Sequence, residues 1–536
     1  MMIMRLVPCL FVALLAACAS PPPARAPLQL TILHTNDHHG RFWTDADGEY
    51  GLAARKTLVD RIRAEVTAQG GQVLLLDGGD INTGTAESDL QDAEPDFKGM
   101  NLLGYDASAV GNHEFDKPWS VLTKQRAWAQ FPLLSANIYK DGKRAFEPYR
   151  IFDKGGYKIA VIGLTTEDTV KMELPDNVRG FEFRRPAAEL AQLLPQVRAK
   201  ADMVIATTHM GHYSGGRHGV SAPGDVEMAR EVPGLDLIVG GHSHDPVCML
   251  GENQRNDAYA PGQPCVPDRQ NGTWIVQAHE WGKYVGRADF VIDAGKVQLV
   301  RYRLIPVNLM RTAADGGKTP YTELIAQDPA VRAFLAPFQS AGDQLLNVSV
   351  GSSDGVFDGS REGVRRRPTN LGILVARSMI ERTGADLALV NGGGLRDSLP
   401  QGNLSYRDVR KVLPFGGTLA VVELTGRDLL EYLRVAVSMT PGAGGFPHTS
   451  GLTARLQGSE LRDVRIKGEP LQPDRKYKLV INHFTAVGGD GYPRLDTHPG
   501  LVDTGFVDDE VLSGYVQRHS PLRTADFDPE ADSIRR

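Results

Sequence analysis

The sequence predicts a layered α/β protein, and three observations lead to this fold class. Short runs such as VLLL and LIV are hydrophobic throughout, which is typical of strands buried on both faces. Helix-like stretches separate these runs, for example residues 52–70 and 187–201. Polar side chains follow each run at once, as expected where neighbouring strands end at one functional edge.

The chain is long enough for more than one hydrophobic core. It has 536 residues, 41% of them hydrophobic and 23% charged, so two large domains or three are expected. The formal net charge is −6 and the pI is about 6.2. This balance argues against polymeric nucleic acid as a partner, because coating it requires a basic face. The net charge does not exclude small anionic ligands, because these need only a few local arginines.

The N-terminus has the features of a processing segment. Residues 1–17 carry Arg5 before the short apolar core LVPCLFVALLAA, which is too short to span a bilayer. The following LAAC resembles a bacterial lipobox, which implies a lipoprotein signal peptide and lipidation of Cys18. Residues 18–27 form a Pro-rich tether, and Ala19 favours the outer membrane by resemblance to Gram-negative lipoproteins. We therefore expect an exported lipoprotein on the periplasmic side that meets the membrane through its lipid alone. A plain secretory signal is the alternative.

The cysteine count fits an oxidising compartment. Of the four cysteines, Cys9 would leave with the signal peptide and Cys18 would take the lipid. Cys248 and Cys265 remain, and a leftover pair outside the cytoplasm predicts one disulfide. Two separate buried thiols are the alternative.

Five apolar runs in the first 250 residues end in metal-ligand residues. Asp37 and His39 are two apart, so they point the same way if strand geometry persists, and His38 then points elsewhere. A single Asp-x-His after a strand is usually just a loop, but five such endings in order are hard to ascribe to coincidence. The collected set is Asp37, His39, Asp80, Asn112, His209, His242 and His244.

This mixed oxygen and nitrogen set suits Zn²⁺, Mn²⁺ or Co²⁺ better than Ca²⁺. Seven ligands are too many for one tetrahedral ion. They suit two divalent metal ions that share a bridging carboxylate, an arrangement used for phosphoryl transfer to water.

At these residues the sequence resembles a known group of enzymes. The order DxH…GGD…GNHE…H…GHxH resembles the calcineurin-like metallophosphoesterase superfamily. The longer stretches LHTNDHHGRFW, DGGDINTGTAESD, THMGHY and NGGGLRDS resemble the bacterial 5′-nucleotidase family, and most closely its periplasmic UDP-sugar hydrolase/5′-nucleotidase branch. The resemblance covers nearly all of the mature chain. It implies a four-layer α/β/β/α metallophosphoesterase domain over residues 28–327 and a smaller α/β C-terminal nucleotide-binding domain over 349–536. Residues 328–348 have the pattern of a helix linking the two.

The resemblance also assigns roles to the ligand set. It implies that Asp37, His39 and His244 bind one metal, and that Asn112, His209 and His242 bind the other. Asp80 would bridge the two ions. Family members carry either Gln or His at the position of His244, so metal preference can differ between them.

His113 and Asp116 resemble the catalytic dyad of the family. A water held between two cations loses its proton readily and can attack phosphorus in line. A protonated His113 beside the phosphoryl oxygens would stabilise the charge that develops there. Asp116, three residues on, would orient the imidazole and raise its pKa.

The second half of the chain carries residues suited to a nucleotide. The resemblance implies that Phe415 and Phe484 sandwich the base, and stacking of this kind accepts different bases. Gly417 stands where close relatives often have Asn, which would loosen contacts to the base. An isolated Phe is otherwise more often a core residue. The resemblance also implies that Arg361, Arg365 and Arg396 contact the phosphate or other polar edges of the nucleotide. It implies that Asp490 contacts the ribose.

The expected activity is release of phosphate from 5′-nucleotides, with hydrolysis of UDP-sugars to UMP and sugar phosphate as a second expected activity. We also expect a monomer whose two domains close by rotation, as in the family. A 2′,3′-cyclic nucleotide phosphodiesterase or another phosphoesterase is the first alternative. A non-catalytic surface protein that binds nucleotides is the second.

Overall fold

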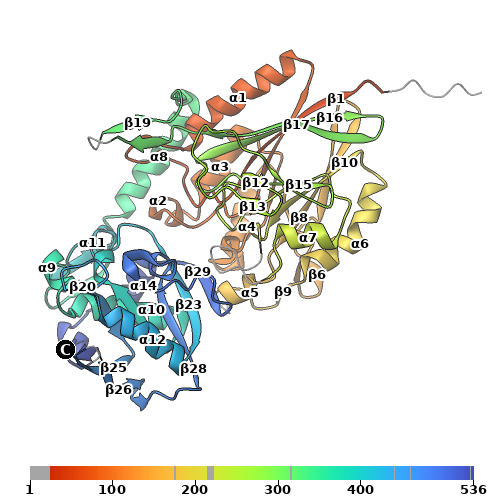
Figure 1. The fold of residues 1–536 in the computed structure, drawn as a ribbon. Coiled ribbons are helices and arrows are strands. Elements are labelled where there is room, and N and C mark those ends of the chain that lie inside the picture. Colours follow the sequence, from red (N-terminus) through yellow and green to blue (C-terminus); the bar gives the residue numbers. More distant parts are fainter. Residues whose placement is uncertain are drawn as a thin grey trace, which may run out of the picture.

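The computed structural model describes residues 25–173, 177–213, 222–313, 317–439, 441–458, 460–531 and 533–535. Figure 1 shows an N-terminal lobe (β1 to β19) and a C-terminal lobe (β20 to β30) joined by helix α8. The expected signal peptide and Cys18 lie outside the described residues. Within the described ranges, no helix is both long and apolar enough to cross a membrane.

Two six-stranded sheets form the centre of the N-terminal lobe. The inner strands of each sheet run parallel. The outer strands are antiparallel to their neighbours, except β4, which is parallel to β3. The first sheet has the order β17 (Lys296–Pro306), β16 (Tyr284–Asp293), β1 (Leu28–Thr35), β2 (Gln72–Asp77), β3 (Ala107–Ala109) and β4 (Leu133–Leu134). The second has the order β14 (Asp268–Gln270), β15 (Thr273–Val276), β11 (Leu237–Val239), β10 (Met203–His209), β8 (Tyr157–Thr165) and β7 (Tyr149–Lys154).

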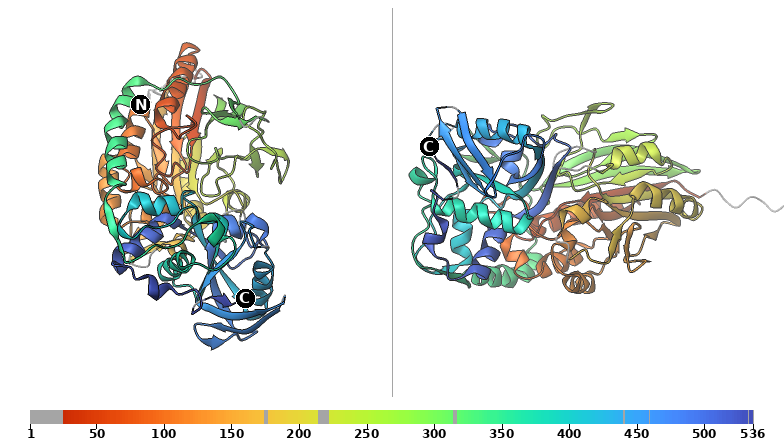
Figure 2. Two further views of the ribbon diagram at one scale, coloured as in Figure 1. Left: turned by 90° about the vertical axis from the view of Figure 1, so that its left-hand side faces the viewer. Right: turned by 90° about the horizontal axis from the view of Figure 1, so that it is seen from below.

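Side-chain alternation along these strands produces four layers. Leu30 and Ile32 of β1 pack between the two sheets with Ile159 of β8, whereas Leu33 faces the helices outside the first sheet. Leu190 covers the outer face of the second sheet. The predicted α/β/β/α order is confirmed (Figures 1 and 2). The helices are α1 (Leu52–Ala68), α3 (Glu94–Leu103), α4 (Trp119–Trp128) and α8 (Pro329–Leu345) on one side, and α6 (Pro186–Arg198) and α7 (Asp225–Glu231) on the other.

The C-terminal lobe is built on a smaller mixed sheet, as the predicted α/β class requires. Its order is β24 (Pro447–Ser450), β21 (Leu387–Asn391), β28 (Lys476–Asn482), β23 (Thr418–Thr425) and β29 (Leu501–Val507). Helices α10 (Asn370–Thr383), α11 (Tyr406–Val412) and α14 (Asp508–His519) cover one face. The other face packs against α12 (Gly426–Val437) and a second sheet of β27 (Glu469–Pro470), β26 (Glu460–Ile466), β25 (Leu452–Gln457) and β30 (Ile534–Arg535).

Helix α8 leads from β19 (Lys318–Pro320) of the first lobe to β20 (Ser349–Ser353) of the second. Asp328 caps its start by accepting hydrogen bonds from the backbone N–H groups of Ala330 (3.0 Å) and Val331 (2.9 Å). Pro329 at the first helical position fits this start, because its missing N–H would have no partner there. The helix packs on the N-terminal lobe, where Val331 and Leu335 join the core outside the first sheet.

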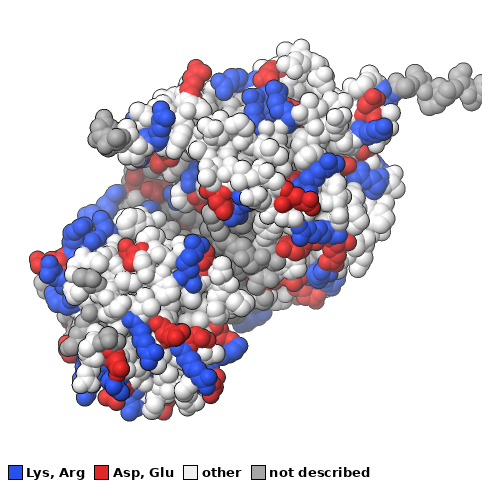
Figure 3. All heavy atoms as spheres, viewed as in Figure 1, with Lys and Arg blue, Asp and Glu red and all other residues white. Residues whose placement is uncertain are grey.

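Cys248 and Cys265 form the predicted disulfide and are both buried. On the face shown in Figure 3, basic and acidic side chains are interspersed over both lobes.

Candidate active site

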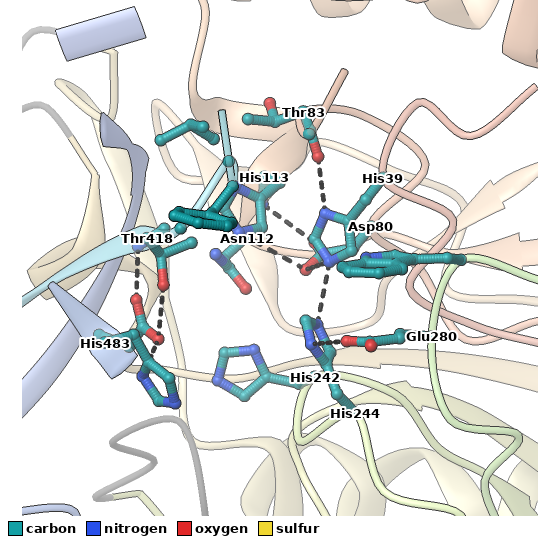
Figure 4. Close-up of a pocket in the computed structure, with 18 of the residues that line it drawn as sticks. His39, Asp80, Thr83, Asn112, His113, His242, His244, Glu280, Thr418 and His483 are labelled. Atoms are coloured by element: carbon teal, nitrogen blue, oxygen red, sulfur yellow. Dashed lines mark hydrogen bonds and ion pairs between the residues drawn. The ribbon is translucent and has the colours of Figure 1, made fainter. Parts of the chain in front are cut away.

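The expected metal ligands lie at the carboxyl ends of five parallel strands, β1, β2 and β3 in one sheet and β10 and β11 in the other. Asp37 and His39 follow β1, and Asp80 follows β2. His209 is the last residue of β10. Because the two sheets face each other, these ends meet at one edge, as the sequence predicts (Figure 4).

One group of ligand atoms comprises Asp37, His39 and His244, whose candidate atoms all lie within 4.8 Å of one another. His244 Nε2 lies 3.2 Å from Asp37 Oδ1 and 3.0 Å from His39 Nε2. Asp80 connects this group to the next, since its Oδ2 lies 3.8 Å from His39 Nε2. Asp80 therefore lies within reach of both groups of ligand atoms.

A second group comprises Asp80, His209 and His242, again within 4.8 Å. His209 Nε2 lies 2.9 Å from Asp80 Oδ2 and 3.2 Å from Asn112 Oδ1. His242 Nε2 is buried and has no hydrogen-bond partner among the described residues. A buried imidazole nitrogen beside carboxylates and other imidazoles fits a divalent cation, so the residues present suit the metals that the sequence predicts.

The backbone at this edge is not extended, which corrects one expectation. Strand β1 ends at Thr35, and φ is 51° at Asp37 and 50° at His39. The two side chains meet because of this left-handed turn rather than because strand geometry continues. Left-handed backbone at non-glycine residues costs about 1–3 kcal/mol each and often gathers at functional sites. The same conformation recurs at Asp80 (57°), His242 (78°) and His244 (52°).

Neighbouring acceptors orient the imidazoles of the ligand set. His39 Nδ1 donates to the Thr83 carbonyl (2.8 Å) and His209 Nδ1 to the Gly78 carbonyl (2.8 Å). His244 Nδ1 lies 2.8 Å from Glu280 Oε2. In each ring Nε2 is thereby directed at the cluster, which is how outer partners commonly fix metal-binding histidines.

Burial and local charge determine which imidazoles are neutral. Burial lowers the pKa of His242 to about 3 and of His39 to about 4. At His209 burial acts in the same direction, but the Asp80 carboxylate outweighs it and raises the pKa to about 9. A neutral ring is the form that binds a metal, so His242 and His39 are ready ligands, whereas His209 must release a proton first.

The two residues expected to form a catalytic dyad lie in contact. His113 Nδ1 lies 2.7 Å from Asp116 Oδ2, and His113 Nε2 lies 3.9 Å from Asp80 Oδ2. Burial disfavours the imidazolium, but Asp116 and Asp80 outweigh that effect and raise the pKa of His113 well above its usual value. From the other lobe, Gly505 of β29 packs on this ring: a Cβ there would lie 2.0 Å from His113 Cε1.

Glu114 holds the two ligand-bearing loops together, a role that the GNHE motif did not reveal. Its Oε2 accepts from the backbone N–H groups of Gly111 (2.6 Å) and Asp80 (3.2 Å), and its Oε1 from those of Ile81 (2.9 Å) and Asn82 (3.3 Å). Burial raises the pKa of Glu114 to about 7. One side chain thus fixes the loop after β2 against the loop after β3.

Most of the C-terminal residues singled out in the sequence gather around a cavity of about 390 Å³. Phe415 and Phe484 are 64% and 52% exposed, so they are not core residues. Arg361 is not part of the wall. The pKa of Arg365 is lowered, first by burial and then by the positive charge of Arg361. The predicted residues in the wall are Arg365, Arg396, Phe415, Phe484 and Asp490.

Two histidines beside the ligand set are structural. His38 Nε2 lies 2.9 Å from the buried Asp96 Oδ1, so it does point elsewhere, as expected. His212 Nε2 lies 2.9 Å from Asp268 Oδ2, away from the cluster.

A cavity of about 410 Å³ lies at the metal cluster and is called the metal cavity below. Several of its lining residues were not found by sequence reasoning, among them Arg41, Trp281 and His483. His483 forms an ion pair with Asp503 (2.8 Å), which also accepts a hydrogen bond from Thr418 (3.0 Å). Each is an isolated residue, and no spacing marks it out.

The fold and this cluster define a two-domain metallophosphoesterase. The calcineurin-like phosphoesterase family matches residues 30–246, and the 5′-nucleotidase C-terminal domain matches residues 349–497. The chain belongs to the 5′-nucleotidase family of metallophosphohydrolases, which confirms the resemblance.

Similar proteins extend over almost the whole chain. It is 54% identical to Protein UshA of Yersinia enterocolitica over 515 residues, 94% of each chain. It is 50% identical to the 5′-nucleotidase of Vibrio cholerae over 538 residues, 98% of this chain and 97% of that one. The NAD nucleotidase (NadN) structure of Haemophilus influenzae shares the fold, with a TM-score of 0.77 at 22% identity over 95% of this chain and 99% of that one.

Proposed function

We propose that this chain hydrolyses 5′-nucleotides to nucleosides and phosphate, and UDP-sugars to UMP and sugar phosphate. One observation carries the proposal: a single cavity of about 410 Å³ joins the metal cluster to both exposed phenylalanines. Its wall includes His113 of the dyad and Phe415 and Phe484 of the other lobe. The expected ligands in the wall are His39, Asp80, Asn112, His242 and His244.

Two divalent ions, of zinc, manganese or cobalt, would be held by the two ligand groups that share Asp80. When bound, they would polarise a phosphoryl oxygen and lower the pKa of a nearby water. Asp37 also accepts the backbone N–H of His242 (2.9 Å), so one carboxylate positions both groups.

The dyad acts on the phosphoryl group. With Nδ1 held by Asp116, His113 presents Nε2 to the cavity as a donor, and the Asp116 and Asp80 carboxylates raise the pKa of the ring, which favours its protonated form. The imidazolium can then donate to a phosphoryl oxygen on which negative charge grows. Asp116 has a lowered pKa, since His113 outweighs the opposing effect of burial, and therefore stays ionised.

The nucleoside is held by the C-terminal lobe. Stacking on the two phenylalanines accepts any base. Arg396 lies over the Phe415 ring at 5.6 Å and supplies a cation near the base site. Asn391 Nδ2 donates to Asp490 Oδ2 (2.7 Å), which fixes that carboxylate for a ribose hydroxyl.

We further propose that the protein is exported and anchored in the outer membrane through Cys18, and that it works as a monomer. Support for export comes from the N-terminal sequence and from the disulfide, because such bonds persist outside the cytoplasm.

The test is release of phosphate from AMP, and of UMP from UDP-glucose, after chelation and again after Mn²⁺, Co²⁺ or Zn²⁺ is restored. Turnover should vanish on chelation and return with metal. His113→Ala should lower kcat by about 10²–10⁴ while nucleotide binding persists. A folded, metal-loaded protein that turns over neither substrate would overturn the proposal and favour a nucleotide-binding protein.

A further inference from the structure

Arg41 is a cation beside the metal cavity for which the nucleotidase mechanism has no use. Its guanidinium carbon lies 4.3 Å from the centre of the Trp281 ring. Its Nε is buried and has no hydrogen-bond partner among the described residues. A buried donor without a partner is costly, so an oxygen-bearing ligand is expected to meet it.

Arg41 also borders another cavity, of about 400 Å³, which is lined by residues of the N-terminal lobe, by Gln339 of α8 and by Arg410 of the C-terminal lobe. That volume lies within the usual range for small-molecule sites. Its wall is rich in hydroxyl, carboxylate and amide groups, which can both donate to and accept from the hydroxyls of a carbohydrate. These groups belong to Thr44, Asp45, Tyr50, Thr85 and Gln339. Arg41 lines both cavities.

The chemistry of the two proposed substrate classes explains why a second cavity is needed. A nucleoside monophosphate has one organic substituent on its phosphorus, and Phe415 and Phe484 receive it. A nucleoside diphosphate sugar carries a nucleoside at one end of the diphosphate and a sugar at the other. When the phosphates of this substrate lie at the metal cluster and its base lies on the C-terminal lobe, the sugar must extend out of the metal cavity in a different direction from the nucleoside.

We propose that Arg41 and the cavity behind it bind the sugar end of nucleoside diphosphate sugars, and so determine whether such substrates are hydrolysed. The guanidinium donates to the oxygens that link the sugar to its phosphate, and the polar wall receives the sugar hydroxyls. The inference rests on the proposed function and goes beyond it, because it assigns a specificity site.

The experiment compares two substrates in the intact, metal-loaded protein. In Arg41→Met, which keeps a long side chain against Trp281, kcat/KM for UDP-glucose should fall about tenfold or more, mainly through KM. The value for AMP should change less than about twofold. Gln339→Met, in the wall of the same cavity, should produce a smaller loss with the same selectivity, and it serves if the first variant fails to fold. Arg61→Ala, on the exposed face of α1, is the matched control and should change neither substrate.

The assignment would be overturned if kcat/KM fell equally for UDP-glucose and AMP in these variants. It would also be overturned if neither Arg41→Met nor Gln339→Met lowered kcat/KM for either substrate. A wild-type protein that hydrolyses AMP and leaves UDP-glucose intact would overturn it too, in which case the nucleotidase proposal still stands. A wild-type protein that hydrolyses neither would overturn the proposed function itself.

Discussion

Replacing Glu114 by Gln removes the acceptor that joins the two ligand loops, and the structure sets the size of the effect. The carboxylate accepts four backbone N–H groups, two on each oxygen. Glutamine keeps one oxygen, and its NH₂ group would face the other two donors. Two buried N–H groups then lose their partner, at about 1–3 kcal/mol each, so the variant should lose about 2–6 kcal/mol. This is a large part of the 5–15 kcal/mol that typically stabilises a protein of this kind.

Tryptophan fluorescence during urea unfolding measures this loss selectively. The tryptophans are Trp43, Trp119, Trp128, Trp274 and Trp281, all in the N-terminal lobe, so the signal reports the lobe that carries the change. Metal content after dialysis should also fall, because Glu114 fixes the loops of Asp80 and Asn112. Glu323→Gln, at an exposed site, is the control. A loss below about 1 kcal/mol with unchanged metal content would refute the reasoning.

Three other changes have defined outcomes. Phe484→Ala should raise KM for AMP about 5- to 150-fold, the equivalent of 1–3 kcal/mol of stacking, in steady-state assays with kcat nearly unchanged. The double variant Cys248→Ser/Cys265→Ser should lose about 3 kcal/mol, since the bond closes a loop of sequence separation 17, and reductant should lower the Tm of the wild type alone. Glu510 is hydrogen-bonded to Asp89 across the lobes, and burial together with Asp89 raises its pKa well above the usual value. The folded protein therefore loses stability as the pH rises above the pKa of this side chain in the unfolded chain, which is about 4.3. Glu510→Gln should raise the Tm at pH 8 and have no effect near pH 4; a gain independent of pH would contradict this.

The layered fold and the metal cluster could be predicted because both depend on local pattern. Buried parallel strands require continuous apolar runs, and ligands must follow them directly, as Asp80 follows β2 and His242 follows β11. The disulfide followed from counting cysteines. The local conformation was harder: Asp37 and His39 meet through left-handed backbone, which an assumption of continued strand geometry cannot supply.

What the sequence by itself determined was which chemical groups the protein carries and at which strand ends they stand. Only the tertiary structure decided which isolated residues join them: Glu114 tying two loops, Arg41 lining two cavities, and Gly505 of the other lobe against His113. The physical reason is that hydrophobic periodicity is a property of neighbouring residues. A partner tens or hundreds of positions away along the chain is selected by packing, and packing leaves no regular spacing to read.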